Sequence, residues 1–320
     1  MTKIFKFVPL LLAVILLASC GAPVDTGDGG ALGVIAPSSP EYGVIGIEDS
    51  LLIGGVTCEN ALLTRVNGLE AVAACRSARQ MYPASMTKVM TFIVAYEYAL
   101  SLEDKMTITQ DIKNSYADAS RKGIDVGDIL TVEQLLYALL LESDTDAALT
   151  LAVNIAGSEE RFVALMNSKC QELGLTDTHF TNATGLHHRE HYTTAADMTS
   201  IFAYALENQL FRDIITTDTY VTRFEYYEEG ELKDYRMTFW NTTISSHKGR
   251  FAESGISLEF DGGKIIGGKT GYTPEAKYCL ALLIMGNDGE EYILITAGSD
   301  SKKKNAEDCY YICENYLKGN

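Results

Sequence analysis

The stretch Tyr82–Phe92 constrains the fold most strongly, because it joins a proline to the start of an apolar helical stripe. Pro83 is tolerated in a segment that leads into a helix but not in its interior. The apolar side chains that follow recur at the spacing of a single helical face: Val89, Phe92, Ile93 and Tyr96. The pattern predicts a buried helix that carries Ser85 in its first turn.

Ser85 and Lys88 lie three residues apart, so they share one face of this predicted helix. The start of a helix also offers backbone N–H groups that have no partner within the helix. A lysine buried beside apolar groups favours its neutral form and can then accept the proton of a hydroxyl group. The pair is a candidate nucleophile and base, although a serine and a solvated lysine also occur together at ordinary helix starts.

The first 20 residues have the form of an export signal. Lys3 and Lys6 precede an apolar run, Phe7–Ala18, that is too short to span a bilayer comfortably. The segment Leu17-Ala18-Ser19-Cys20 resembles the lipobox of bacterial lipoproteins, which implies cleavage before Cys20 and acylation of its sulfur and amine. We therefore expect a lipid-anchored protein on the extracytoplasmic face of the membrane. An ordinary signal peptide with an incidental cysteine, or an uncleaved anchor, remains the alternative.

Residues 21–44 are rich in Gly, Pro, Ser, Ala and Asp and have no apolar period, which predicts a flexible tether. Residues 45–320 suffice for one large domain. We expect no further C-terminal β domain or amphipathic anchor helix, and we expect the lipid to provide the anchoring. A formal net charge of −17 argues against nucleic acid as a partner, because phosphate backbones bind clustered lysine and arginine.

The chain has seven cysteines. Six remain if Cys20 carries lipid, and their scattered positions match no metal-binding spacing. Cys58 and Cys75 are the only candidates for a disulfide bridge. We expect neither a metal nor a cofactor.

Turn and capping signals divide the first half of the domain. Ala61–Arg65 and Ala71–Cys75 flank Asn67-Gly68, a dipeptide that favours a tight hairpin turn. Thr131-x-x-Gln134 has the form of a capping box, and the helix that it begins should end near Glu142. Three more helical segments follow: one ending at Gly157, one over Glu159–Leu173, and one capped by Thr194.

The pattern changes to strands after about residue 218. The strand-like segments are Tyr220–Tyr227, Ile265–Gly268, Tyr278–Met285 and Tyr292–Ala297. Asn287-Asp288-Gly289 should join the last two as a hairpin, and Lys302–Leu317 should form a closing helix. Strands at both ends of the domain, with helices between them, predict one sheet built from N-terminal and C-terminal strands.

Three short motifs occur in a fixed order: Ser85-Met86-Thr87-Lys88, then Ser143-Asp144-Thr145 between two helices, then Lys269-Thr270-Gly271 on a late strand. Together they resemble the motif set of the penicillin-binding D-alanyl-D-alanine carboxypeptidases, a family of serine peptidases among the low-molecular-mass penicillin-binding proteins. The similarity runs from about Ala61 to Ala297. It implies an α+β, β-lactamase/transpeptidase-like fold, with an antiparallel sheet flanked by helices and an all-helical lobe.

The resemblance also implies a catalytic role for each motif. Ser85 would attack the D-Ala-D-Ala carbonyl, Lys88 would deprotonate it, and Ser143 would relay protons to the leaving amine. Substrate-binding roles fall to the third motif, its next residue and one residue of the second motif: Lys269, Thr270, Gly271, Tyr272 and Thr145.

The implied contacts are specific. Lys269 and Thr270 would bind the terminal carboxylate, and Gly271 would let the strand approach the substrate closely. The backbone N–H groups of Ser85 and Tyr272 would stabilise the oxyanion. The implied activity is removal of the terminal D-alanine from peptidoglycan pentapeptides, which limits cross-linking of the cell wall and so affects cell shape. A β-lactam would be trapped as an ester on Ser85.

The second motif departs from the family pattern, because Thr145 stands where asparagine is usual and Asp144 where glycine is common. Threonine has one short hydroxyl group, whereas asparagine offers a donor and an acceptor. An inactive lipid-anchored protein that binds muropeptides or β-lactams therefore remains an alternative. A serine β-lactamase is another, but it would need a carboxylate that activates water for deacylation.

The segment His187-His188-Arg189-Glu190-His191 fits the His-x-x-Glu-His pattern of some zinc peptidases. That pattern requires a helix. Here it follows Asn182–Gly185, a segment whose residues are typical of a loop. The sequence therefore favours the serine mechanism over a zinc site.

Overall fold

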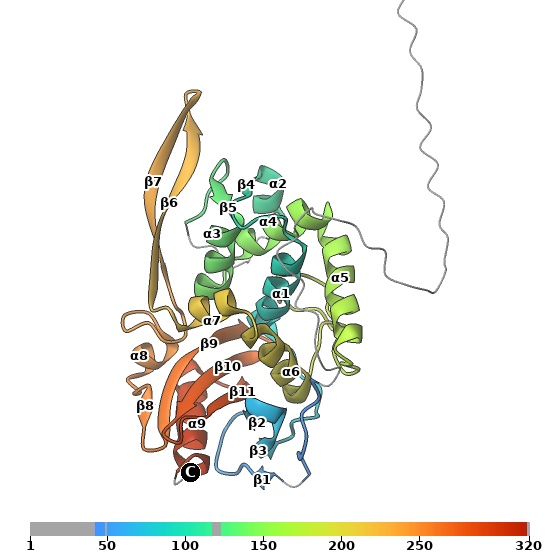
Figure 1. The fold of residues 1–320 in the computed structure, drawn as a ribbon, viewed down its shortest axis with the longest axis vertical. Helices are drawn as coiled ribbons and strands as arrows, with labels where there is room; N and C mark the ends of the chain where they lie inside the picture. The colour runs from blue at the N-terminus through green and yellow to red at the C-terminus, as the bar shows by residue number, and fades with distance from the viewer. Residues whose placement is uncertain (1–41, 49, 117–122, 319–320) are drawn as a thin grey trace, which may run out of the picture. The chain divides into compact units, whose positions relative to one another are not determined.

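The main sheet has seven strands in the order β1-β3-β2-β11-β10-β9-β8. In the computed structural model, which describes residues 42–48, 50–116 and 123–318, all described residues belong to one unit of the chain, residues 31–320 (Figure 1). The strands are β1 (Leu51–Leu52), β2 (Asn60–Arg65), β3 (Ala71–Cys75), β8 (Glu259–Phe260), β9 (Gly263–Thr273), β10 (Lys277–Gly286) and β11 (Glu291–Ser299). The signal segment with Cys20, and the tether up to residue 41, lie outside the described residues.

The pairing confirms the predicted union of N-terminal and C-terminal strands. β2 lies antiparallel to β11, with Leu62 opposite Ile295 and Leu63 opposite Leu294. Both predicted hairpins are present, β2 with β3 and β10 with β11. Only the short β1 pairs in parallel, with β3, among the strands of this sheet.

The sheet is apolar on both faces, because successive side chains of a strand point to opposite sides. Leu62 and Ile295 belong to the core on one face, and Leu63 and Leu294 to the core on the other. Helix α6 (Ala195–Leu206) packs against β2 and β11 on the first face, and α9 (Lys302–Tyr316) supplies Ile312 to the second core. The closing helix is therefore present as predicted.

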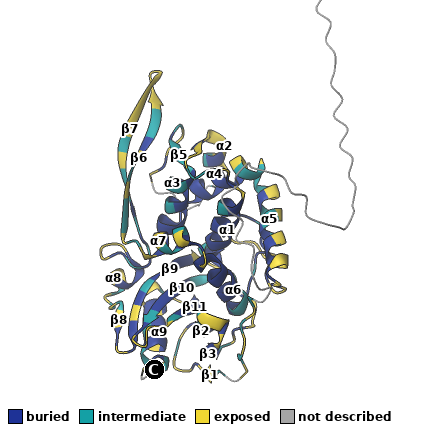
Figure 2. Ribbon diagram, viewed as in Figure 1, coloured by how far each residue is buried: buried dark blue, intermediate teal, exposed yellow. Residues whose placement is uncertain are grey.

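The middle of the chain is helical, as predicted. Its elements are α1 (Lys88–Tyr98), α2 (Gln110–Asn114), α3 (Val132–Tyr137), a π-helical turn (Ala138–Glu142), α4 (Thr145–Ala156), α5 (Glu159–Glu172) and α7 (Gln209–Thr216). Thr131 and Gln134 form the expected capping box at the start of α3. α1 contacts α4, α5 and α6 and is buried along most of its length (Figure 2). Among the described residues no helix is both long and apolar enough to cross a membrane.

A second, four-stranded antiparallel sheet accompanies these helices and was not predicted. Its order is β4-β5-β6-β7, with β4 (Lys105–Thr107), β5 (Ile129–Thr131), β6 (Thr219–Glu228) and β7 (Glu231–Trp240). The segment Tyr220–Tyr227 is a strand as predicted, but it belongs to this sheet and not to the main one. The reason is a tight turn at Glu229-Gly230, both with positive φ, that folds β7 back along the full length of β6 (Figure 1).

The predicted bridge between Cys58 and Cys75 is wrong, because every described cysteine is a free thiol. Asp308 on α9 accepts hydrogen bonds from the backbone N–H groups of Thr57 and Cys58, each 2.8 Å long. These bonds hold Cys58 in the core beside α9, whereas Cys75 pairs with Ala61 at the end of β3.

Candidate active site

Ser85 lies in a 3-10 turn, Ala84–Thr87, that directly precedes α1. The sequence predicted Ser85 within the first turn of the helix itself. The difference arises at Ala84, whose φ of 47° is left-handed and interrupts helical geometry after Pro83. Lys88 Nζ lies 3.3 Å from Ser85 Oγ and donates to it. The turn therefore presents the hydroxyl group to the lysine, as the spacing of three residues required.

Lys88 is the first residue of α1 and is 1% exposed. Its ammonium also donates to the backbone carbonyl of Thr184 at 2.5 Å. Burial lowers the pKa of Lys88 to about 8, and the charge of nearby Asp144 partly opposes this shift. A substantial fraction of Lys88 is therefore neutral near pH 8, which is the form that can accept a proton.

Ser143 ends the π-helical turn in a left-handed conformation, with φ of 60°. Lys269 Nζ on β9 donates to Ser143 Oγ at 2.8 Å and to the carbonyl of Thr270 at 3.1 Å. Lys269 is fully buried, and burial holds its pKa well below the usual value, helped by the charges of Lys88 and Arg250. The second and third motifs are thus joined by a hydrogen bond, and the first motif contributes to the same pocket.

This pocket has a volume of about 310 Å³. Its lining includes Ser85, Ser143, Thr242, Arg250, Thr270 and Tyr272. The hydroxyl groups of Thr242 and Thr270 lie 3.0 Å apart, so two hydroxyl groups meet on one wall. Sequence reasoning missed Thr242, which follows β7 in a segment without any periodic pattern.

Arg250 was also missed, although it brings a buried cation to the pocket. It begins the short helix α8 (Arg250–Ser254), is 5% exposed, and donates to Asn305 Oδ1 of α9 at 2.5 Å. Its guanidinium carbon lies 5.2 Å from the ring centre of Tyr278. No ion pair joins it to any carboxylate of the described residues, so its charge is left for an anion that enters the pocket.

Gly271 brings β9 close to the turn that carries Ser85. A Cβ atom at this position would lie 3.0 Å from the carbonyl oxygen of Pro83 and 3.2 Å from Ala84 Cβ. The absence of a side chain at Gly271 therefore leaves room for the turn that carries Ser85, in addition to any substrate. The neighbouring Tyr272 lines the pocket and packs against Tyr278, with ring centres 4.5 Å apart.

The two unusual residues of the second motif are both buried. Asp144 is fully buried and caps α4 by accepting from Ala147 N–H at 2.9 Å. Its charge acts on Lys88, so it does not stand exposed at the carboxylate end of the pocket. Thr145 is 2% exposed in the first turn of α4 and is not among the described residues that line the pocket.

A loop that sequence reasoning did not connect with the site accepts a hydrogen bond from Lys88. Asn182 Oδ1 accepts from the backbone N–H groups of Thr184 and Gly185, at 3.1 and 2.7 Å. This arrangement fixes the Thr184 carbonyl that receives Lys88. Gly185 has φ of +84°, and a Cβ atom there would lie 2.0 Å from the carbonyl oxygen of Ala84. The glycine is required because the loop lies against the turn that carries Ser85.

The His187–His191 segment is a loop, as predicted, and its last histidine serves a structural purpose. His191 Nδ1 accepts from the Thr181 N–H at 3.1 Å, so Nε2 is the nitrogen that donates to Thr87 Oγ1 at 2.8 Å. Burial, together with the neighbouring histidines, lowers the pKa of His191 to about 3. A neutral His191 therefore holds the turn next to Lys88. No group of three His, Cys, Asp or Glu side chains suited to a metal ion occurs in the described ranges.

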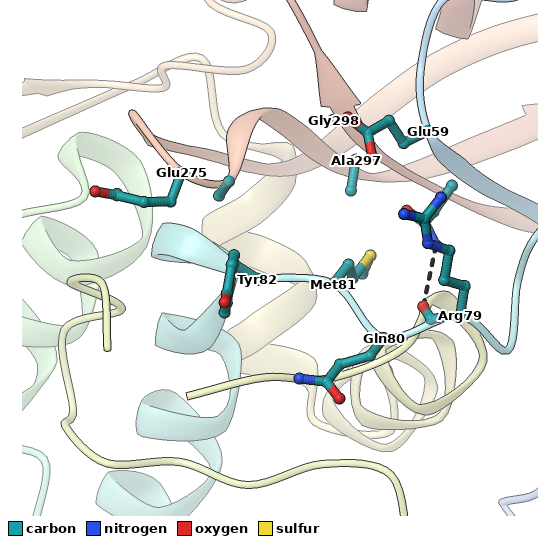
Figure 3. A pocket seen from close by; sticks show the side chains of 10 residues that line it. Glu59, Arg79, Gln80, Met81, Tyr82, Glu275, Ala297 and Gly298 are labelled. Atoms are coloured by element: carbon teal, nitrogen blue, oxygen red, sulfur yellow. Dashed lines mark hydrogen bonds between the residues drawn. The ribbon is translucent and has the colours of Figure 1, made fainter. Parts of the chain in front are cut away.

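A second pocket, of about 220 Å³, is lined in part by the segment Arg79–Tyr82, which leads to Ser85 (Figure 3). Arg79, Met81 and Tyr82 line it from that segment, and Glu275 lines it from the turn after β9. None of the three motifs contributes to its lining. The first pocket is therefore the candidate active site.

Comparison with known proteins agrees with this geometry. A family model described as D-alanyl-D-alanine carboxypeptidase matches residues 54–300. D-alanyl-D-alanine carboxypeptidase DacF of Bacillus subtilis (strain 168) is 32% identical over 235 residues, which cover 72% of this chain and 55% of the relative. A D-alanyl-D-alanine carboxypeptidase of Streptomyces sp. (strain K15) is 34% identical over 206 residues, 61% of this chain and 65% of that protein. This chain thus spans between half and two thirds of these relatives.

The fold matches the crystal structure of the Streptomyces K15 DD-transpeptidase with a TM-score of 0.71 and 28% identity, over 82% of this chain and 97% of that one. The predicted α+β, β-lactamase/transpeptidase-like fold is therefore confirmed. The chain belongs to the D-alanyl-D-alanine carboxypeptidase family of serine peptidases, among the low-molecular-mass penicillin-binding proteins.

Proposed function

We propose that this protein is a serine D-Ala-D-Ala carboxypeptidase that removes the terminal D-alanine from peptidoglycan pentapeptides. The observation that carries the proposal is the pair of lysine–serine hydrogen bonds in one site, Lys88 to Ser85 and Lys269 to Ser143. A serine needs an adjacent base to become nucleophilic, and the lowered pKa of Lys88 supplies one. The membership of the family supports the same chemistry.

In this mechanism Lys88 takes the proton of Ser85, and Ser85 Oγ attacks the carbonyl carbon between the two D-alanines. The Ser85 and Tyr272 N–H groups would bind the oxyanion, since Gly271 lets β9 lie against the turn of Ser85. Ser143 accepts a hydrogen bond from Lys269, so its own proton is free to move to the leaving nitrogen. D-alanine departs, and water then hydrolyses the ester.

The terminal carboxylate would bind at the wall formed by the Thr242 and Thr270 hydroxyl groups, with Arg250 and Lys269 as cations. An anion at this wall favours the protonated form of Lys269. Thr145 is buried in the first turn of α4, so we assign it a part in holding that turn and not in contacting the substrate. A β-lactam, whose carboxylate and strained amide resemble the dipeptide, would acylate Ser85.

The test of this function is release of free D-alanine from a soluble peptide ending in D-Ala-D-Ala, by protein that begins at Gly21. We expect release by the wild type and at least about 10³-fold less by Ser85→Ala, because removal of the nucleophile leaves only binding and oxyanion stabilisation. Equal release by both proteins, or none by correctly folded wild type, would contradict the proposal.

We further infer that the precursor is cleaved before Cys20 and carries lipid there, so that the enzyme acts at the extracytoplasmic face of the membrane. The support is the charged start, the apolar run and the lipobox-like segment in this order. The chain purified from bacterial membranes should begin at Cys20 and carry the added mass of acyl chains on that residue. A mature chain with an unmodified Cys20, or one that retains residues 1–19, would rule out the lipid.

A further inference from the structure

Glu142 is a buried carboxylate in the active-site pocket with no role in the mechanism above. It is the last residue of the π-helical turn, directly before Ser143. Its side chain lines the same pocket as Ser85 and Thr270, yet it is only 6% exposed. One carboxylate oxygen, Oε1, accepts a hydrogen bond from the Trp240 N–H at 2.9 Å. This bond fixes the side chain beside the proton-relay serine.

The carboxylate of Glu142 has no cationic partner within ion-pair distance in the part of the chain that the structure describes. The pocket's other carboxylate, Glu253, is paired with Lys302 at 2.9 Å and is 43% exposed. A buried charge without a partner opposes folding, because water solvates the charge better than the protein interior does. The charge of Glu142 favours the protonated form of the buried Lys269 without an ion pair between the two, so the carboxylate can also meet a positive charge that arises in the pocket.

The terminal carboxylate of the substrate is negative, so it cannot be the group that Glu142 attracts. Arg250 in the pocket lining, and Lys269 that donates to Ser143 behind it, match a carboxylate, whereas Glu142 would repel it. The nitrogen of the leaving group becomes positively charged at one stage of the reaction only. Its nitrogen is a neutral amide in the bound peptide, but it must take up a proton before the C–N bond can break.

Resting on the proposed function, we propose that Glu142 stabilises the positive charge that develops on the leaving nitrogen and then holds the ammonium group of the released D-amino acid. In the tetrahedral intermediate the proton of Ser85 passes through Lys88 and Ser143 to this nitrogen, which becomes positively charged. The C–N bond then breaks, its electrons stay with nitrogen, and the carbonyl re-forms. The neutral amine gains a proton from water and becomes a zwitterion.

The pocket suits such a zwitterion on both sides. Arg250 and the Thr242–Thr270 hydroxyl pair face the carboxylate, and Glu142 beside Ser143 faces the nitrogen. A contact that strengthens only as the nitrogen becomes charged accelerates the reaction, because it stabilises the transition state more than the bound substrate. The negative charge of Glu142 also favours the protonated form of Lys269, which supports the same arrangement.

The test compares an amide and an ester that differ in one atom: a peptide ending in D-Ala-D-Ala and its analogue ending in D-Ala-D-lactate. Glu142→Gln keeps an acceptor for the Trp240 N–H but loses the charge. We expect kcat/KM for the amide to fall by about 10- to 100-fold, as for loss of one transition-state contact. The ester should change by less than about threefold, since its leaving oxygen departs without a positive charge.

Two further variants serve as controls. Glu142→Asp keeps the charge and should recover most of the lost amide activity, and Glu253→Gln removes a carboxylate that is already paired and should affect amide and ester alike. Melting temperature and acylation by a fluorescent penicillin establish that each variant is folded. Equal losses of Glu142→Gln on amide and ester would overturn the role of Glu142, while a wild type that cleaves neither substrate would overturn the proposed function instead.

A measurement on the unaltered protein completes the test. Free D-alanine should inhibit wild-type cleavage more strongly than D-lactate does, because only D-alanine carries the ammonium group that Glu142 would hold. Inhibition by D-lactate that equals or exceeds that by D-alanine would contradict the inference, whatever the folding of the variants.

Discussion

Replacement of Lys88 by methionine should lower the rate of acylation of Ser85 by about 10²- to 10⁴-fold, the usual contribution of a positioned general base. Methionine fills a similar volume but cannot accept a proton, and the loop carbonyl of Thr184 loses its donor. The rate is measured with a peptide substrate and with a penicillin. Acylation at the wild-type rate would exclude Lys88 as the base.

The rate of acylation of the wild-type protein should depend on pH through the titration of Lys88. The pKa of Lys88 is lowered to about 8, so its neutral, reactive fraction rises as pH increases through 8. Acylation should therefore increase about tenfold per pH unit well below pH 8 and level off above it. The residual activity of Lys88→Met should lack this rise. A wild-type profile that is flat between pH 6 and 9 would contradict the assignment.

Lys88→Met should also raise the free energy of unfolding. A lysine whose pKa falls from 10.5 to about 8 on folding binds its proton more weakly in the native state, so stability declines as pH falls through this range and stays low below it. This cost is about 3 kcal/mol at pH 7. Lost hydrogen bonds to Ser85 and Thr184 offset part of the gain, leaving a net increase of about 1 kcal/mol in the free energy of unfolding.

The second large effect concerns Arg250. Arg250→Gln should lower kcat/KM for a peptide ending in D-Ala-D-Ala by about 10²-fold or more, because it removes a desolvated cation from the site of the carboxylate. Glutamine keeps a donor for Asn305, so the contact between α8 and α9 can persist. The effect should fall mainly on KM, since the carboxylate is charged both in the bound substrate and in the transition state.

A peptide with an amidated C-terminus distinguishes this role from a structural one. It lacks the carboxylate, so wild type and Arg250→Gln should cleave it at similarly low rates. Lys248→Ala is the matched control, because Lys248 also lines the pocket but is exposed and should change kcat/KM by less than about fivefold. An equal loss by Arg250→Gln on the free acid and the amide would show that Arg250 only supports the fold.

The sequence predicted those parts of the site in which residues close together in the chain determine where a side chain lies. Three residues between Ser85 and Lys88 suffice to bring the two side chains together, and the capping box at Thr131 sets where the helix toward Ser143 begins. Apolar runs on either side of Asn287-Asp288-Gly289 likewise identified β10 and β11, because strands whose two faces are both buried are apolar at successive positions. The left-handed Ala84, which shifts Ser85 out of the helix, has no such signal.

The residues that were missed come from segments whose positions depend on distant contacts. Arg250 is placed by Asn305 on the last helix, and the loop of the Thr184 carbonyl is held by Thr91 on α1, which donates to the Ala183 carbonyl. Glu142 has the sequence context of an apolar helix end, and the bond from Trp240 at the end of the unpredicted strand β7 fixes it in the pocket. Such contacts join residues about 55 to 100 positions apart, beyond the reach of periodicity.

The measurement that tests the central claim most directly is the mass of the intact protein after brief exposure to benzylpenicillin, followed by peptide mapping. The mechanism predicts an increase equal to the mass of one penicillin, located on the peptide that contains Ser85, and no such adduct on Ser85→Ala. An adduct on another residue, or none on folded wild-type protein, would contradict the claim that Ser85 is the nucleophile of a penicillin-binding carboxypeptidase.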